Sequence, residues 1–325
     1  MKIAVFANMK AGGGKAAPAV IQRICDAWSK RQDVELFGVK GFGGEMLPRH
    51  LAKEDEPFGY LPRLNAAVCA LLREEPDILL TVGGDGAAAY AAECVIRQGS
   101  KVPILAIGAG TANVGPIVSF AADELPEPEA LETVSLGAVE ASDGEGRHIA
   151  FGFNDIVIGN TFLGTSPEGK TKTYQARALA ECGALTEASP VKTIFKEGIC
   201  MSLDGKLMAP PPYAVAQLVA SPLGADRFYG RAVTGLLCYT PDSPYRAALY
   251  ISPHPVVSME EDDAGFTGWR TGGQLLLTAD DALRLEKLSD DVCVVADGNP
   301  YLLPSGSVTL HYEPDVIRVL KRRAL

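Results

Sequence analysis

The amino-acid sequence predicts two domains: an α/β domain built on a Rossmann-like parallel sheet, followed by an all-β, sandwich-like domain. In the first part of the chain, apolar runs of strand length alternate with segments of helical periodicity, and three of those runs end in glycine-rich loops. After about residue 130 short apolar runs separated by Gly, Pro and Asp dominate. We place the nucleotide-binding domain at residues 1–130 and the β-rich substrate domain at residues 131–325, with the last ~15 residues as a segment that can pack back on the first domain.

A βαβ unit is predicted at the start of the chain. Residues 2–7 form a compact apolar run typical of a strand, and residues 8–15 (NMKAGGGK) form a glycine loop. Residues 17–31 place apolar side chains along one helical face, and residues 34–39 have the pattern of a second strand. Because a helix joining two strands brings them together in parallel, this unit predicts a sheet covered by helices.

Two more strands in the first domain also end in glycines. Residues 60–75 predict a helix, and residues 77–94 (DILLTVGGDGAAAYAAEC) predict a buried strand, a turn and an Ala-rich helix. Residues 102–107 form another buried strand. The carboxyl ends of parallel strands are where ligands bind in α/β sheets, so the glycine loops at these ends predict a nucleotide phosphate site. The loops span residues 12–14, 83–86 and 108–115.

The second domain is predicted from short strand-like runs with turn residues between them. A short helix is expected within residues 173–182. The expected strands cover residues 149–153, 156–158, 191–195, 199–203, 213–219, 246–251, 274–278, 292–296 and 307–312.

Composition excludes several classes of function. The net charge of −10 and the pI of about 5.0 argue against nucleic acid as a partner, because phosphate contacts need clustered Lys and Arg. The seven cysteines are scattered without a CxxC pair, which fits a reduced cytoplasmic protein. We find no signal peptide and no apolar stretch of about 18 residues, so no integral membrane segment is expected.

An acid stands in the middle glycine loop. Asp85 would repel a phosphate directly, so it is expected to hold a metal, take a proton or receive a hydroxyl. The structural alternative is that Asp85 caps the following helix. The common phosphate motifs do not match: Met9 stands at the first glycine of a Walker A pattern that would end at Gly14-Lys15, and Asn113 at the third glycine of a dinucleotide fingerprint.

The sequence Gly83-Gly84-Asp85-Gly86 after an apolar strand resembles the GGDG signature of the superfamily of NAD kinases and diacylglycerol or sphingosine lipid kinases. Residues 8–14 are similar to its N-x-x-A-G-x-G loop, and residues 110–113 to its second loop. Asn154-Asp155 is similar to the nucleoside-binding pair of NAD kinases, residues 220–224 to a degenerate S-T-P-T-G loop, and Asp297-Gly298 to the terminal strands.

The resemblance implies an active site in the cleft between the two domains, a role for Mg²⁺, ATP or polyphosphate as phosphoryl donor, and a homo-oligomer. It implies that Asp85 is the catalytic residue, and that Asn154, Asp155 and Ser221 bind the acceptor, with no residue identified as a direct metal ligand. The residues implied to bind nucleotide phosphate are Asn8, Gly12, Gly13, Gly14, Gly83, Gly84, Gly86, Gly110, Thr111 and Asn113.

The sequence favours an ATP-dependent kinase acting on the 2′-hydroxyl of NAD to give NADP. One alternative is a lipid kinase of the diacylglycerol or sphingosine type, whose apolar entrance would involve residues 209–212 or 266–269. Another is a nucleotide-binding regulator with weakened catalysis. The chain departs from the superfamily at Ala87, where threonine is usual and its hydroxyl could contact phosphate.

Overall fold

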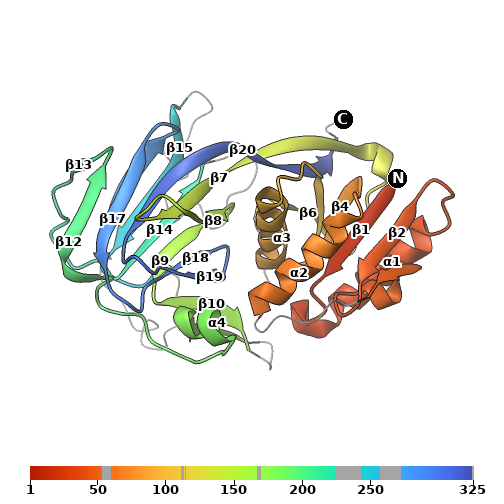
Figure 1. Ribbon diagram of the computed structural model, residues 1–325, viewed down its shortest axis with the longest axis horizontal. Coiled ribbons are helices and arrows are strands. Elements are labelled where there is room, and N and C mark those ends of the chain that lie inside the picture. The colour runs from red at the N-terminus through yellow and green to blue at the C-terminus, as the bar shows by residue number, and fades with distance from the viewer. Residues whose placement is uncertain are drawn as a thin grey trace. The chain divides into compact units, whose positions relative to one another are not determined.

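The computed structural model describes residues 1–52, 60–110, 113, 115–166, 170–223, 243–256 and 272–323 (Figure 1). The chain divides into two compact units. Unit 1 contains Met1–Leu136 and Asp315–Leu325, and unit 2 contains Gly137–Pro314. Two long strands, β7 (Leu131–Asp143) and β20 (Val308–Arg322), contribute residues to both units.

Unit 1 is built on a parallel sheet with the strand order β3-β2-β1-β4-β5. The last residues of β20 and the short strand β6 also pair with β5. The strands β1 and β4 are apolar and almost wholly buried, as expected where helices cover both faces of a sheet. These strands are β1 (Lys2–Ala7), β2 (Glu35–Val39), β3 (Arg49–Leu51), β4 (Ile78–Gly83), β5 (Ile104–Gly108) and β6 (Val118–Ala121).

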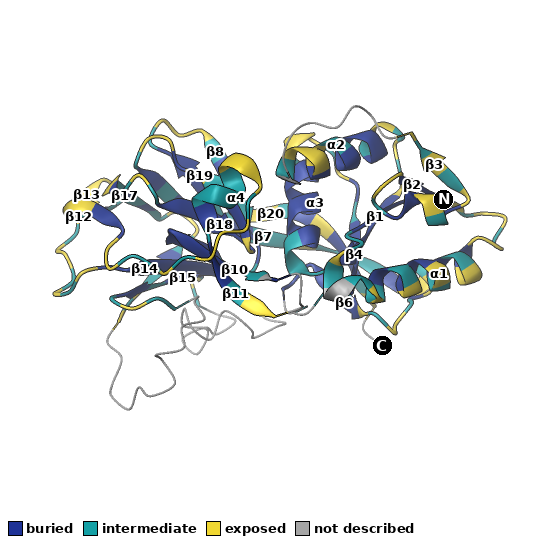
Figure 2. Cartoon of the chain, turned by 90° about the horizontal axis from the view of Figure 1, so that it is seen from below, coloured by how far each residue is buried: buried dark blue, intermediate teal, exposed yellow. Residues whose placement is uncertain are grey.

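Three α-helices among the described residues of unit 1 cover this sheet. Helix α1 (Ala16–Trp28) buries Val20, Ile21 and Ile24 against one face, and Figure 2 shows α2 (Tyr60–Arg73) on the opposite side of the sheet. Helix α3 (Asp85–Arg97) is buried at every position from residue 87 to residue 95, because its many alanines leave room for close packing on all sides. Three 3₁₀ turns complete the unit: η1 (Ala11–Gly14), η2 (Gly44–Met46) and η3 (Pro128–Ala130).

Unit 2 is antiparallel. One sheet has the order β16-β15-β14-β9-β18-β19, and a second layer contains β13-β12-β17-β20 with β7 and β8. Apolar residues of both layers, such as Leu218 and Val294 from the first and Leu285 and Leu310 from the second, share one core. The elements are β8 (His148–Gly152), β9 (Ile156–Gly159), β10 (Thr161–Thr165), β11 (Thr171–Gln175), α4 (Ala176–Cys182), β12 (Phe195–Leu203), β13 (Lys206–Leu207), β14 (Gln217–Pro222), β15 (Tyr245–Ser252), β16 (Gly273–Thr278), β17 (Ala282–Leu288), β18 (Cys293–Ala296) and β19 (Asn299–Leu302).

The predicted fold class is confirmed in both units: a parallel α/β sheet, and a β-rich antiparallel sandwich. Several local predictions were wrong or incomplete: strands β3, β6, β10, β11, β13, β17 and β19 were not predicted, and the strand expected at residues 213–219 begins only at Gln217. Residues 191–194 are a loop, in which the side chain of Asn160 holds the backbone of Val191. Strand β7 was not predicted, because its glycine and its irregularly spaced polar residues hide the period of two. The expected helix within residues 173–182 begins only at Ala176.

None of the described helices is both long enough and apolar enough to cross a membrane.

Candidate active site

The three glycine loops meet at one edge of the sheet in unit 1. Strand β4 lies between β1 and β5, and all three are parallel, so their carboxyl ends lie together. Backbone hydrogen bonds join the loops: the N–H of Asn8 donates to the carbonyl of Val82 at 2.9 Å, and the N–H of Ala109 donates to that of Gly83 at 2.7 Å. The structure therefore brings together the loops that the sequence predicts as a phosphate site.

Two of the glycines are required by close packing, one between these loops and one within the β5–β6 loop. A Cβ atom on Gly110 would lie 2.6 Å from the Cα of Gly84, which is a backbone atom that cannot turn aside. A Cβ atom on Gly108 would lie 2.7 Å from the side chain of Asn113. The β4 and β5 loops thus lie against one another along their main chains where Gly110 meets Gly84, and only glycine fits there.

Asp85 begins helix α3 and is tied to the β5–β6 loop. Its Oδ1 atom accepts a hydrogen bond from the N–H of Gly115 at 2.9 Å. Gly84 occupies the N-cap position of the helix, so Asp85 stands one residue inside it, where a carboxylate also interacts favourably with the helix dipole. The carboxylate thus joins two loops, which the capping alternative does not explain.

The neighbouring Ala87 is buried and close to Gly83. It is 8% exposed, and its Cβ would lie 3.1 Å from a Cβ built on Gly83. The side chain at position 87 therefore points toward the glycine turn. A threonine there would bring a hydroxyl group to the turn, and alanine does not.

The two loop asparagines bind their own loops. The Oδ1 of Asn8 accepts the N–H of Lys10 at 3.1 Å. The side-chain amide of Asn113 exchanges two hydrogen bonds with the backbone of Gly110, each 3.1 Å long. These contacts shape the loops. Gly12, Gly13 and Gly14 form part of η1 at the start of α1, and Thr111 lies outside the described residues.

A second polar cluster lies in unit 2, around Asn154 and Asp155. The buried carboxylate of Asp297 accepts three backbone hydrogen bonds: from Phe153 at 2.8 Å, from Asn154 at 2.7 Å and from Asp155 at 3.0 Å. The N–H of Asp297 also donates to the carbonyl of Asp155 at 3.0 Å. Asp297 therefore fixes the backbone of the Asn154-Asp155 pair.

Strand pairing brings Ser221 to the same end of the sheet. Ile156 pairs with Ala220 on one side and with Ala296 on the other. Asp155, Ser221 and Asp297 are each one residue beyond these pairs: Ser221 is in β14, Asp155 directly precedes β9 and Asp297 directly follows β18. Ser221 is fully buried, and its Oγ has no hydrogen-bond partner within the described part of the chain.

Burial dominates the electrostatics of this cluster. The low-dielectric surroundings of Asp297 raise the pKa of its carboxyl to about 7, and the negative charge of Asp155 adds to the effect. The three backbone N–H donors act in the opposite direction and lower this pKa.

Sequence reasoning did not name Asp297 as a site residue, although its Asp-Gly dipeptide is a turn signal. Asp297 and Gly298 have φ values of 48° and 80° and form the tight turn between β18 and β19.

The fold and part of the sequence match known kinases. Residues 2–143 match the family model described as the diacylglycerol kinase catalytic domain. The structure is similar to that of a yeast NADH kinase in complex with NADH, with 14% identity, a TM-score of 0.54 and coverage of 100% of this chain and 84% of the other. It is also similar to a candidate diacylglycerol kinase from Bacillus anthracis strain Sterne, with 11% identity, a TM-score of 0.54 and coverage of 98% and 97%.

At such low identities the two structural matches show a common fold. No curated protein sequence matched the chain. The family match and the shared fold confirm the resemblance to the superfamily that was stated from the glycine motifs.

Proposed function

Since the chain combines a diacylglycerol kinase catalytic-domain match with the fold shared by NAD and lipid kinases, we propose that it transfers a phosphoryl group to the 2′-hydroxyl of NAD. One observation carries the catalytic part of the proposal: the carboxylate of Asp85 is held by Gly115 at the meeting point of three glycine loops. Phosphoryl transfer needs a positioned acceptor and compensation of charge more than covalent chemistry by the protein.

The loops of unit 1 suit the donor. Their glycines let the main chain approach phosphate closely, and the start of α3 provides a positive dipole end. Asp85 would accept the proton of the attacking hydroxyl, or orient that hydroxyl toward the γ-phosphoryl group. ATP is the proposed donor, and polyphosphate would present the same chemistry.

The site also offers an oxygen ligand that fits Mg²⁺ bound together with ATP. Asp85 offers a hard oxygen ligand, and Mg²⁺ is usually bound by one or two carboxylates together with the phosphates of the substrate. When bound, the ion would neutralise charge on the phosphates. Within the described residues of the three loops, Asp85 is the carboxylate that could contact it.

The polar cluster of unit 2 suits a nucleoside acceptor. Asn154, Asp155 and Ser221 offer amide, carboxylate and hydroxyl groups, which are suited to hydrogen-bonding ribose hydroxyls and base edges. The buried Oγ of Ser221, which has no partner among the described residues, supports this role, since a buried hydroxyl without a partner costs about 1–3 kcal/mol unless something satisfies it.

A lipid acceptor is the second candidate. The match to the diacylglycerol kinase family model favours it, and so does an open groove of about 510 Å³ in unit 2. Phe195, Ile199 and the three consecutive prolines 210–212 line this groove, which supports the apolar entrance predicted at residues 209–212. Residues 266–269 lie outside the described residues.

Product analysis separates these candidates. The purified protein is incubated with ATP and Mg²⁺, with NAD in one reaction and diacylglycerol micelles in another, and the products are identified by mass spectrometry. NADP in the first reaction supports the proposal, whereas phosphorylated lipid without NADP contradicts it. Nucleotide binding without either product would indicate the regulator, and polyphosphate in place of ATP tests the donor.

A further inference from the structure

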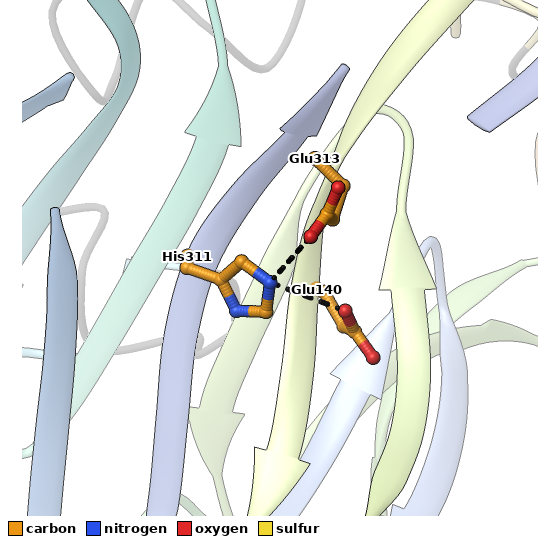
Figure 3. Close-up of side chains that lie close together, drawn as sticks. All are labelled: Glu140, His311 and Glu313. Carbon is orange, nitrogen blue, oxygen red and sulfur yellow. Dashed lines mark hydrogen bonds and ion pairs between the residues drawn. The ribbon is translucent and has the colours of Figure 1, made fainter. Parts of the chain in front are cut away.

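A group of histidine and glutamate side chains lies in unit 2. None of its residues has a role in the site proposed above. Glu140 comes from β7, and His311 and Glu313 come from β20, which pairs with β7. Figure 3 shows the three side chains pointing toward one another. Among the described residues, this is the group of His, Cys, Asp or Glu whose ligand atoms all lie within 4.8 Å of one another.

Two of the three separations between these atoms match those of ligands around a small cation, and the third is within 4.8 Å. The Nε2 atom of His311 lies 3.2 Å from Oε2 of Glu140 and 3.0 Å from Oε1 of Glu313. Zinc binds such atoms at about 2.0–2.2 Å, which places two ligands about 3.0 Å apart at a right angle and about 3.4 Å apart at the tetrahedral angle. The imidazole nitrogen therefore lies at a distance from each carboxylate oxygen that suits two ligands of one metal ion.

A fourth residue supports the group. The Nδ1 atom of His148, on β8, lies 2.6 Å from Oε1 of Glu140, the oxygen that does not face His311. Hydrogen bonds of this kind orient metal-binding carboxylates and are a general feature of protein metal sites. Only 17% of the Glu140 side chain is exposed, so its carboxylate is already held in place.

The types of ligand atom in this group determine which class of metal ion it would bind. One imidazole nitrogen with two carboxylate oxygens suits zinc and other divalent transition metals, whereas Mg²⁺ and Ca²⁺ prefer oxygen ligands alone. We propose that Glu140, His311 and Glu313 form a binding site for a divalent transition-metal ion, best matched by Zn²⁺, in which His148 orients Glu140. Three protein ligands would leave a position open for water or another small ligand.

The alternative is that the four side chains form only an ion-pair network, with a protonated His311 between two carboxylates. Zinc titration of metal-stripped protein, in competition with a chromophoric chelator, distinguishes the two. The proposal predicts one Zn²⁺ per chain, and at least about a 100-fold weaker binding in His311→Asn. It also predicts about 10–100-fold weaker binding in His148→Asn, the range found for residues that support metal ligands.

Two further variants control this experiment. His50→Asn removes an exposed histidine of β3 in unit 1 and should leave zinc affinity unchanged. Glu313→Gln removes a ligand that is 43% exposed, so it tests the site even if His311→Asn does not fold. Absence of stoichiometric zinc, or equal affinity in the wild type and the Glu313→Gln variant, would overturn the proposal. The readout is metal binding, so it does not depend on the kinase reaction.

Discussion

The carboxylate of Asp85 accepts a hydrogen bond from the backbone N–H of Gly115, which is 30 residues away in the sequence. This bond ties the start of α3, which follows β4, to the loop that follows β5. It holds the one acid of the glycine loops in a fixed direction. The position of Gly115 is therefore coupled to the geometry of the proposed catalytic group.

Gly115→Ala should impair the chemical step. The added Cβ would lie 3.0 Å from Oδ1 of Asp85 and 3.1 Å from its Cγ, so the carboxylate must shift. The required shift is a few tenths of an ångström, so we expect kcat to fall several-fold, less than the ~100-fold loss that a misplacement of about 1 Å can cause. Gly146→Ala controls for the glycine-to-alanine change itself, because its added Cβ would have no atom within 4 Å; its φ of 79° adds strain that Gly115→Ala lacks, which should lower stability and not kcat. An equal kcat in the two variants would refute the coupling between Gly115 and the carboxylate of Asp85.

Ala87→Thr should raise kcat/KM for ATP several-fold by restoring a hydroxyl near the glycine turn. Ala87→Val has nearly the same shape without the hydroxyl and serves as the matched control. Both substitutions add volume to a buried position and should destabilise the protein by about 1–3 kcal/mol. Steady-state kinetics with varied ATP measures the effect. If Thr and Val gave the same kcat/KM, the hydroxyl would have no role.

Asp297→Ala should weaken acceptor binding. It leaves the N–H groups of Phe153, Asn154 and Asp155 without their acceptor, so the backbone of the proposed binding pair loses its anchor. The expected result is a higher KM for NAD with a smaller change in KM for ATP, together with a destabilisation of at least about 1–3 kcal/mol.

Asp204→Ala controls for backbone strain at position 297. Asp204 has a φ of 51°, close to that of Asp297, and accepts a hydrogen bond from Ala282 in a turn outside the proposed site. The Asp204→Ala variant should be less stable than the wild type but have the same KM for NAD. If both variants raised this KM equally, Asp297 would have no positioning role.

The buried carboxyl of Asp297 should make stability depend on pH. Its pKa is about 7 in the folded protein and about 3.9 in an unfolded chain, so the folded state binds more protons between these values. This contribution to stability is complete below about pH 4 and is lost as the pH rises through about 7. We expect the free energy of unfolding, measured with urea, to decrease between pH 5 and pH 8. This decrease should be smaller for Asp297→Asn than for the wild type. An equal decrease would contradict the raised pKa.

Local patterns predicted much of unit 1 correctly. The apolar run of β4, the glycines that follow it and the alanines of α3 lie within one short stretch, so their structure could be inferred from neighbouring residues. The meeting of the three loops also followed from the rule for parallel strands.

The positioning contacts could not be predicted in the same way. Asp85 meets Gly115 across two loops, and Asp297 meets Asn154 across more than 140 residues, so both contacts depend on tertiary packing. The cluster of Glu140 and His311 was missed for the same reason, because sequence spacing gave no sign that β7 and β20 are paired. The predicted contacts of Asn8 and Asn113 with ligand stay predictions.

The central claim is that Asp85 is the catalytic carboxylate of a phosphoryl transfer. The most direct test is the single-turnover rate of transfer from ATP to NAD in the wild type and in Asp85→Asn, which keeps an oxygen for the N–H of Gly115. Asp26→Asn, at an exposed position of α1, is the matched control. We predict that Asp85→Asn still binds ATP but, at saturating ATP and Mg²⁺, transfers about 10²–10⁴-fold more slowly, while the control is unchanged. Transfer at the wild-type rate by Asp85→Asn would contradict the claim.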